Sequence, residues 1–380
     1  MKQIKGGVTA AKGFKAASTA AGIKYKDRTD MAMIYSEVPC AVAGTFTTNI
    51  VKAAPVKWDQ HVVYDSKKAQ AVIVNAGIAN ACTGEEGMGY CKATAEKVNK
   101  LLQIPTDEVL VASTGVIGMQ LPIDRICAGV ETMVPQLNGD IESGHNAALA
   151  IMTTDTHEKE VAVEIELSGK TVTIGGMCKG SGMIHPNMCT MLSFVTTDAA
   201  ISQELLLEAL KADVEDTYNM ISVDGDTSTN DTVLLLASGL SGAEIVDGTP
   251  DYDTFVAALT EAAEHLSREL AGDGEGATKL LECTVTGAPD LATARAVSKS
   301  VIHSTLFKAA MFGADANWGR VLCAIGYTPG DFDISKTSVR LKSKAGEVFV
   351  CENAAYHPYS EDEAAVVLKE DEIDILVDLG

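Results

Sequence analysis

The sequence lacks a long uncharged apolar run and has no cluster of lysine and arginine. A helix that crosses a bilayer needs about 20 mostly apolar residues, and the N-terminal Met-Lys-Gln-Ile-Lys-Gly-Gly-Val-Thr-Ala contains no apolar stretch typical of a secretion signal. Nucleic acids and anionic membranes are bound by basic surfaces, whereas this chain carries a formal net charge of −22. We therefore expect a cytoplasmic protein that binds neither nucleic acid nor membrane.

Short motifs for disulfides, metals and nucleotides are also missing. The nine cysteines include no CxxC pair, and their odd number without an export signal indicates reduced thiols. The acidic and hydroxyl residues of 222–231 lack the spacing of an EF-hand calcium loop, so we expect no metal. The glycines of 179–182 match neither the phosphate-binding loop nor the dinucleotide fingerprint, so we expect no bound cofactor.

The length and periodicity indicate a large soluble α/β enzyme. A chain of 380 residues, 46% of them hydrophobic, can bury a sizeable core and is long enough for two lobes. Amphipathic stretches predict helices at residues 88–102, 141–152, 202–220, 252–270 and 291–312. Short apolar or alternating runs predict strands at residues 71–75, 109–113, 161–167, 170–174, 191–197, 232–238, 280–286, 338–341, 347–350, 364–368 and 373–379. We expect the lobe boundary between residues 173 and 197.

Residues 179–198 form a loop rich in glycine that runs into an apolar strand, and Thr190 stands where the two meet. Such a loop can hold a strained peptide bond, and strain at one bond is a route to self-cleavage. A break before Thr190 would leave a threonine whose own α-amino group can activate its hydroxyl as a nucleophile. Threonine is also common at the start of a strand, and that ordinary role stays open at this point.

Several other residues could serve such a nucleophile. Thr114 and Gly115 follow a predicted strand and could offer a hydroxyl and a backbone N–H to an oxyanion. Lys179 is either an anion-binding residue of the glycine-rich loop or a surface lysine. Glu275 stands among glycines and is either a solvated loop residue or a carboxylate that a cationic substrate can approach. Asp155 follows a predicted helix and is expected to orient neighbouring hydroxyls.

More ordinary roles are expected for other polar residues. Asn75 ends a predicted strand, and Asn80 and Thr83 follow it; at such positions their side chains favour turn chemistry over a binding site. His185 has no acid or cysteine at catalytic spacing, so we do not expect it to act as a base. Cys189 has no electropositive neighbour in the sequence except Lys179, so its small size before Thr190 explains it better than a nucleophilic thiol.

The motifs together point to one family. The cleavage loop reads Lys179-Gly-Ser-Gly-Met-Ile, then Pro186-Asn-Met, then Thr190-Met-Leu. The other motifs, spread over nearly the whole chain, are Gly6-Gly-Val-Thr-Ala, Asn75-Ala-Gly, Ala79-Asn-Ala-Cys-Thr-Gly, Ser113-Thr-Gly-Val-Ile-Gly, Thr153-Thr-Asp-Thr, Ser222-Val-Asp-Gly-Asp-Thr-Ser-Thr-Asn-Asp, Gly274-Glu-Gly-Ala-Thr-Lys and Gly313-Ala-Asp-Ala-Asn-Trp-Gly-Arg. With these motifs the sequence resembles the ornithine acetyltransferases, the glutamate N-acetyltransferases of arginine biosynthesis.

The resemblance implies an α/β (α+β) fold, a two-lobed α/β sandwich of the ornithine acetyltransferase/DmpA-like type with the active site between the lobes. It also implies self-cleavage between Cys189 and Thr190 into an α chain of residues 1–189 and a β chain of residues 190–380, which stay together, usually as α2β2. The family more commonly has alanine where Cys189 stands, and cysteine is small enough not to block the cut. The resemblance further implies a substrate-binding tail beyond Gly380, with an asparagine and a terminal serine or threonine.

The reaction is implied by the same resemblance. Thr190 would take the acetyl group from N-acetylornithine and pass it to glutamate, while Thr114 and Gly115 stabilise the oxyanion. Thr153, Lys179, Thr190 and Glu275 would contact substrate. The charges agree, because Lys179 suits a substrate carboxylate and Glu275 an ammonium group. Acetyl-CoA as a second donor, a self-cleaving aminopeptidase or amidase, and a non-catalytic binding protein stay open as alternatives.

Overall fold

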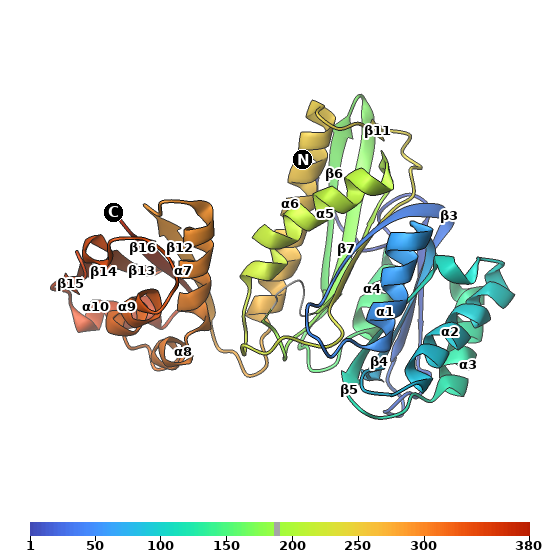
Figure 1. Cartoon of the computed structure of the whole chain (residues 1–380), viewed down its shortest axis with the longest axis horizontal. Coiled ribbons are helices and arrows are strands. Elements are labelled where there is room, and N and C mark those ends of the chain that lie inside the picture. The colour runs from blue at the N-terminus through green and yellow to red at the C-terminus, as the bar shows by residue number, and fades with distance from the viewer. Residues whose placement is uncertain (186–190) are drawn as a thin grey trace. The chain divides into compact units, whose positions relative to one another are not determined.

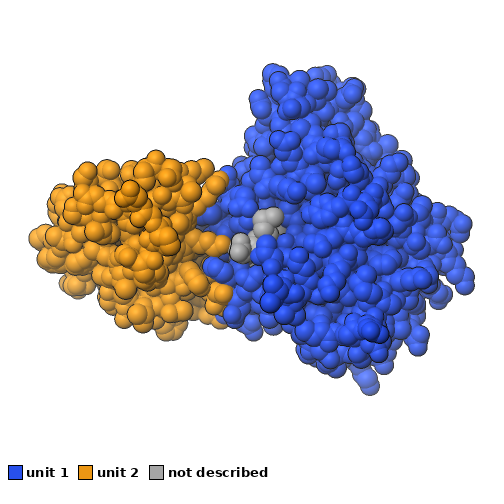
Figure 2. Space-filling model, viewed as in Figure 1, with its two compact units in different colours: residues 1–221, 226–275 blue, residues 222–225, 276–380 orange. Residues whose placement is uncertain are grey.

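The computed structural model describes residues 1–185 and 191–380. They form two compact units: a larger unit of residues 1–221 with 226–275, and a smaller unit of residues 222–225 with 276–380 (Figures 1 and 2). The lobe boundary predicted between residues 173 and 197 is wrong. The predicted boundary region contains most of strand β7 (Lys170–Lys179) and all of strand β8 (Leu192–Thr197). These two strands pair antiparallel within one sheet of the larger unit.

Among the described residues, the larger unit is built on a nine-stranded sheet. The strands follow the order β1-β6-β7-β8-β10-β3-β4-β5, and β2 also pairs with β3. Neighbours are antiparallel except for the parallel pairs β4 with β5 and β8 with β10. The remaining bounds are β1 (Lys2–Gln3), β2 (Phe14–Thr19), β3 (Met31–Phe46), β4 (Lys68–Ile78), β5 (Val109–Val116), β6 (Lys159–Leu167) and β10 (Thr232–Ala237), with a separate pair β9 (Ala200–Ile201) and β11 (Glu244–Ile245).

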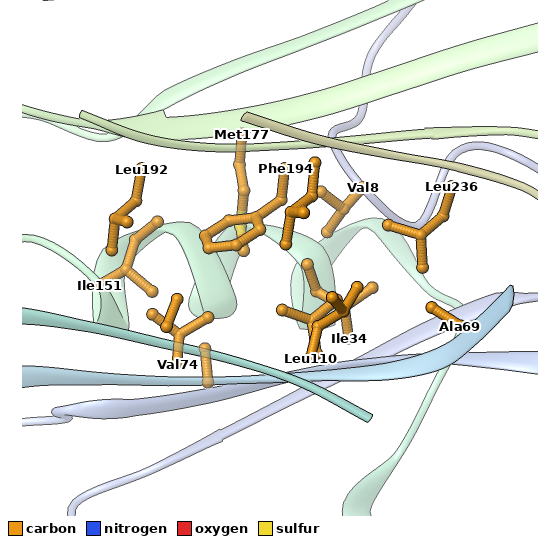
Figure 3. Close-up of a cluster of buried hydrophobic side chains, with 14 of the residues drawn as sticks. Val8, Ile34, Ala69, Val74, Leu110, Ile151, Met177, Leu192, Phe194 and Leu236 are labelled. Atoms are coloured by element: carbon orange, nitrogen blue, oxygen red, sulfur yellow. The ribbon is translucent and has the colours of Figure 1, made fainter. Parts of the chain in front are cut away.

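The strands of this sheet supply both sides of a buried apolar core. Figure 3 shows Met177, Phe194 and Leu236 from β7, β8 and β10 facing Val74 and Leu110 from β4 and β5. Burying such side chains stabilises the fold by roughly 1.5–3 kcal/mol each. The predicted hairpin of β6 and β7 is confirmed: it turns at Ser168 and Gly169, whose φ angles of 48° and 77° are typical of a tight hairpin turn.

Helices pack against the sheet of the larger unit and against one another. Helix α6 packs on β6 and β7, α4 on β2 and β3, and α5 on β3, while α2 and α3 pack together. Their bounds are α1 (Ala54–His61), α2 (Glu86–Leu102), α3 (Ile123–Met133), α4 (Ile141–Ala150), α5 (Gln203–Asp216) and α6 (Pro250–Gly272). Of all helices in the described ranges, none is both long and apolar enough to cross a membrane.

The smaller unit has its own sheet and core. In the described residues its five strands follow the order β12-β16-β13-β14-β15, and helix α7 packs on β12 while α10 packs on β13 and β14. The bounds are β12 (Leu280–Thr286), α7 (Leu291–His303), α8 (Thr305–Phe312), α9 (Trp318–Gly326), β13 (Ser338–Ser343), β14 (Gly346–Glu352), β15 (Ala355–Tyr356), α10 (Glu361–Leu368) and β16 (Glu372–Asp378).

Most predicted elements are confirmed, but two in the smaller unit are not. The strand predicted at residues 364–368 is the end of helix α10, which begins after Ser360, whose side chain accepts a hydrogen bond from the Glu363 backbone. Three acidic residues fill the first turn of α10, where they favour a helix. The helix predicted at residues 291–312 is divided at Ser304, whose side chain accepts from the Phe307 backbone and starts α8.

Candidate active site

A cavity of about 380 Å³ lies in the larger unit, where strands of its sheet end or begin. The last residues of β5 and β7 reach it, as do residues at the starts of β8 and β10. The lining contains acidic, basic and hydroxyl side chains together with glycines: Lys24, Tyr25, Gly77, Thr114, Gly115, Val116, Ile117, Thr153, Thr154, Lys179, Gly180, Gly182, Met183, Met191, Leu192, Ser228, Asn230, Asp231 and Glu275. The cavity therefore brings together Thr114, Gly115, Thr153, Lys179 and Glu275, the predicted site residues within the described part of the chain.

Lys179 connects several of these residues. It is the last residue of β7 and is 7% exposed. Its Nζ donates to Thr153 Oγ1 at 2.8 Å and to Thr114 Oγ1 at 3.4 Å, and it lies 3.7 Å from Asp155 Oδ2. Burial lowers the pKa of Lys179, and the negative charge of Asp155 opposes that effect. Lys179 is therefore a buried lysine at the cavity wall and not a surface lysine.

A second buried lysine stands behind Lys179. Lys159, the first residue of β6, is 1% exposed, and its Nζ donates to Asp155 Oδ1 at 3.0 Å and to Asp273 Oδ2 at 2.6 Å. Burial opposes the charged form of Lys159, but Asp155 and Asp273 outweigh it and raise its pKa. Asp155 accepts further hydrogen bonds from the backbone N–H of Thr153 and Gly180. Its predicted contact with hydroxyl groups is replaced by contacts with two ammonium groups and two amides.

The Thr114-Gly115 corner depends on glycine. Gly115 has φ of +124°, and a Cβ there would lie 2.3 Å from the backbone carbon of Gly77, its partner on the neighbouring parallel strand β4. No other residue fits without moving one of the two strands. Thr114 and Gly115, adjacent in the chain, both line the cavity.

Glu275 is held against the glycine-rich loop that follows β7. Its backbone N–H donates to Ser181 O at 2.9 Å. A Cβ on Gly182 would lie 2.3 Å from Glu275 Oε2, so the carboxylate occupies the space that the missing side chain leaves. The residue is exposed and lines the cavity, as expected for a carboxylate that a cation can approach.

Asp231 lines the cavity from the start of β10 and was not predicted as a site residue. It is 1% exposed, and burial raises its pKa well above the ordinary value, while Ser228 and the charge of Lys179 lower it. Met191 lines the same cavity, and its carbonyl accepts a hydrogen bond from the Thr232 backbone at 2.9 Å. The predicted cleavage residues Cys189 and Thr190 lie outside the described residues.

Asn75, Asn80 and Thr83 are not in this cavity. Asn75 Nδ2 donates to Ile78 O, Asn80 Nδ2 donates to Gly87 O, and the Thr83 hydroxyl donates to Asn80 Oδ1. All three residues are buried. The contacts of Asn80 and Thr83 hold the chain between β4 and α2, so the prediction that they serve local turn structure is confirmed. Asn75 lies inside strand β4, and its contact with Ile78 is local to the end of that strand.

Lys159 and Asp273 were missed, although one signal pointed to Lys159. Side chains alternate along a strand, and Lys159 is in phase with the buried Val161, Val163 and Ile165 of β6. A lysine on the buried face of a strand needs a carboxylate partner. The partner Asp273 lies 114 positions further along the chain, and no short-range pattern could identify it.

The described residues offer no obvious metal centre. Nowhere in 1–185 and 191–380 do three or more histidine, cysteine, aspartate or glutamate side chains form a group that could hold a metal ion. The buried carboxylates of Asp155 and Asp273 are instead balanced by Lys159, and Asp155 also accepts a hydrogen bond from the Gly180 backbone N–H.

A mixed α/β protein with a cavity lined by a buried lysine, hydroxyl groups and carboxylates is typical of an enzyme that acts on small charged molecules. A family model described as the ArgJ family matches residues 15–380. The chain is 49% identical over 380 residues to the arginine biosynthesis bifunctional protein ArgJ of Caldanaerobacter subterraneus subsp. tengcongensis, covering 100% of this chain and 93% of that protein. It is 46% identical to the ArgJ protein of Thermotoga neapolitana, covering 97% and 92%.

A solved relative carries a more specific description. The crystal structure of ornithine acetyltransferase from Mycobacterium tuberculosis, complexed with ornithine, is 45% identical in sequence, with a TM-score of 0.46; the match covers 49% of this chain and 98% of that chain. By the family match and the full-length relatives, this chain belongs to the ArgJ family, and the resemblance noted in the sequence is confirmed.

Proposed function

We propose that the protein is a glutamate N-acetyltransferase of arginine biosynthesis, which moves the acetyl group of N-acetylornithine to glutamate and yields ornithine and N-acetylglutamate. The observation that carries this proposal is the single cavity that collects Thr114, Gly115, Thr153, Lys179 and Glu275 in a member of the ArgJ family. The names of the relatives support it, since they are arginine biosynthesis proteins and an ornithine acetyltransferase.

In the proposed reaction, cleavage between Cys189 and Thr190 first frees the α-amino group of Thr190. That amine takes the proton of the Thr190 hydroxyl, whose oxygen attacks the acetyl carbonyl of N-acetylornithine. The hydroxyl of Thr114 and the N–H of Gly115 stabilise the oxyanion. The C–N bond then breaks, the proton passes to the leaving amine, and ornithine departs from an acetyl-Thr190 ester.

The second half of the reaction reverses these steps with another amine. The α-amino group of glutamate attacks the ester, the bond from Thr190 Oγ1 to the acetyl carbon breaks, and the hydroxyl recovers its proton. Lys179 and Thr153 bind a substrate carboxylate, and Glu275 binds the side-chain ammonium group of ornithine. A cavity lined by both a lysine and a carboxylate suits a substrate that carries both signs.

The same proposal covers assembly and donor. Chains of residues 1–189 and 190–380 remain together, as α2β2, in the cytoplasm, and no bound cofactor takes part. Relatives are named bifunctional, which supports a second activity with acetyl-CoA as the acetyl donor to glutamate.

Thr190→Ala and Cys189→Ala test the nucleophile as a matched pair. Intact-mass analysis reports cleavage and its position, and isotopically labelled glutamate reports acetyl transfer from N-acetylornithine. Wild type and Cys189→Ala should give two chains and transfer acetyl, because a small residue remains before the cut. Thr190→Ala should stay uncut and inactive. Transfer by Thr190→Ala would disprove the assigned nucleophile, and peptide hydrolysis without transfer by wild type would indicate an aminopeptidase instead.

A further inference from the structure

Four charged side chains form a buried cluster at the cavity wall of the larger unit: Asp155, Lys159, Lys179 and Asp273. The side chains of Asp155 and Lys159 are 0% exposed, and those of Asp273 and Lys179 are 3% and 9% exposed. They come from separate places in the chain: Asp155 from the turn after α4, Lys159 from β6, Lys179 from β7 and Asp273 from the end of α6. Only Lys179 of the four lines the cavity.

Asp155 is the centre of this cluster. Its Oδ1 accepts from Lys159 Nζ at 3.0 Å and from the Gly180 backbone at 2.6 Å. Its Oδ2 accepts from the Thr153 backbone at 2.9 Å and lies 3.7 Å from Lys179 Nζ. The Asp155 carboxylate therefore holds the backbone N–H groups of Thr153 and Gly180, and it also lies close to the ammonium group of Lys179.

We propose that Asp155 is a positioning residue of the active site, which keeps the Lys179 ammonium group charged and directed at the substrate carboxylate. This inference rests on the proposed function. Asp155 is separated from the cavity by the groups it holds, so it acts through Lys179 and does not touch substrate. Lys159 and Asp273 hold Asp155 in place, and the backbone that follows Asp273 carries Glu275 to the same cavity.

Each charged group around Lys179 shifts the pKa of Lys179 in a defined direction, and that direction can be measured. The groups that act on Lys179 are Asp155 from the turn after α4, Lys159 from β6 and Asp231 from the start of β10; Glu275 and Lys24 also line the cavity. Burial lowers the pKa of Lys179, Asp155 and Asp231 raise it, and Lys159 lowers it.

Asp155 can act on Lys179 throughout the neutral range because it stays ionised. Burial alone would raise its pKa, but the two lysines and two backbone N–H groups lower it to about 2. Loss of the Asp155 charge should therefore make Lys179 lose its proton at lower pH. Loss of the Lys159 charge should have the opposite effect, because two ammonium groups near one another disfavour protonation.

Asp155→Asn and Lys159→Gln form the decisive pair of variants. Competitive labelling with acetic anhydride over a range of pH, followed by mass spectrometry, reports the titration of Lys179 whether or not the protein transfers acetyl. We expect Asp155→Asn to shift this titration down, and Lys159→Gln to shift it up, each by about one pH unit or more. The alkaline limb of the kcat/KM profile for N-acetylornithine should move in the same two directions, mainly through KM.

Glu269→Gln provides the control, since this α6 carboxylate interacts with His157 near the cluster and is partly exposed. It should leave the titration of Lys179 unchanged. If the cluster had a purely structural role, Asp155→Asn and Lys159→Gln would lower activity at every pH without moving the alkaline limb of the kcat/KM profile. An unchanged titration of Lys179 in these variants would overturn the proposal. If Asp155→Asn does not fold, the direction of the Lys159→Gln shift decides alone. Wild type without acetyl transfer would disprove the proposed function, while the labelling result would still judge Asp155.

Discussion

Asp213 on helix α5 should make the stability of the protein depend on pH. The residue is 4% exposed. Burial, with the nearby charges of Glu264 and Asp216, raises the pKa of its carboxyl group to about 7, although the hydrogen bond with the Thr260 side chain opposes this shift. In the folded protein Asp213 thus holds a proton at pH values where the unfolded chain, with an ordinary pKa of 3.8, has lost it.

The sign follows from this difference in bound protons. A raised pKa in the folded state means that the free energy of unfolding falls as pH rises from about 4 to about 7, and then stays level. Each pKa unit corresponds to about 1.4 kcal/mol. Asp213→Asn removes the titration while keeping the size of the side chain, so its stability relative to wild type should rise by about 3 kcal/mol between pH 5 and pH 8.

Urea unfolding of the purified protein at pH 5 and pH 8 measures this change. Glu208→Gln removes an exposed carboxylate from the same helix and should leave the gap to wild type unchanged. If the gap between Asp213→Asn and wild type were equal at both pH values, the reasoning about Asp213 would be refuted.

Other substitutions probe the cavity and its glycines. Thr114→Val should lower kcat by about 10²–10³ with a smaller change in KM, since one oxyanion donor is lost. Gly115→Ala should abolish transfer and lower the melting temperature, because its Cβ meets the Gly77 backbone. Gly182→Ala displaces only the flexible Glu275 side chain, so KM for N-acetylornithine should rise while the melting temperature holds. Gly89→Ala, in open space on α2, should stabilise by about 0.5–1 kcal/mol in urea unfolding. A change mainly in KM for Thr114→Val, or mainly in kcat for Gly182→Ala, would contradict these assignments.

The sequence was sufficient to predict the residues that line the cavity from glycine-rich turns. Thr114-Gly115, Lys179 and Glu275 each lie beside glycines that permit close backbone approach, and that local chemistry is visible in the chain itself. Lys159 and Asp273 could not be paired in this way, because their contact depends on how α6 packs against β6.

Much of the fold was predictable for similar reasons. The prediction was wrong where local signals favour both a strand and a helix. Alternation and turn residues defined the β6–β7 hairpin correctly. Residues 364–368 form a short apolar run that is compatible with a strand or a helix, and the Ser360 cap with its acidic turn decides for a helix. The predicted lobe boundary was wrong because the glycine-rich segment joins two consecutive strands that pair in one sheet, and its composition alone does not show whether such a segment separates two units.

The strand order of the larger unit has a consequence for the proposed cleavage products. Strands β8 and β10 belong to residues 190–380, yet in the sheet they stand between β7 and β3, which belong to residues 1–189. The chain of residues 1–189 would lack the two central strands β8 and β10, and the chain of residues 190–380 would lack the strands on both sides of them. Without the chain of residues 190–380, the chain of residues 1–189 would expose the unpaired edges of β7 and β3, and unpaired strand edges promote aggregation. The proposed cleavage would thus cut a covalent link without creating two independent folding units, and two genes encoding the halves separately would have to supply them together.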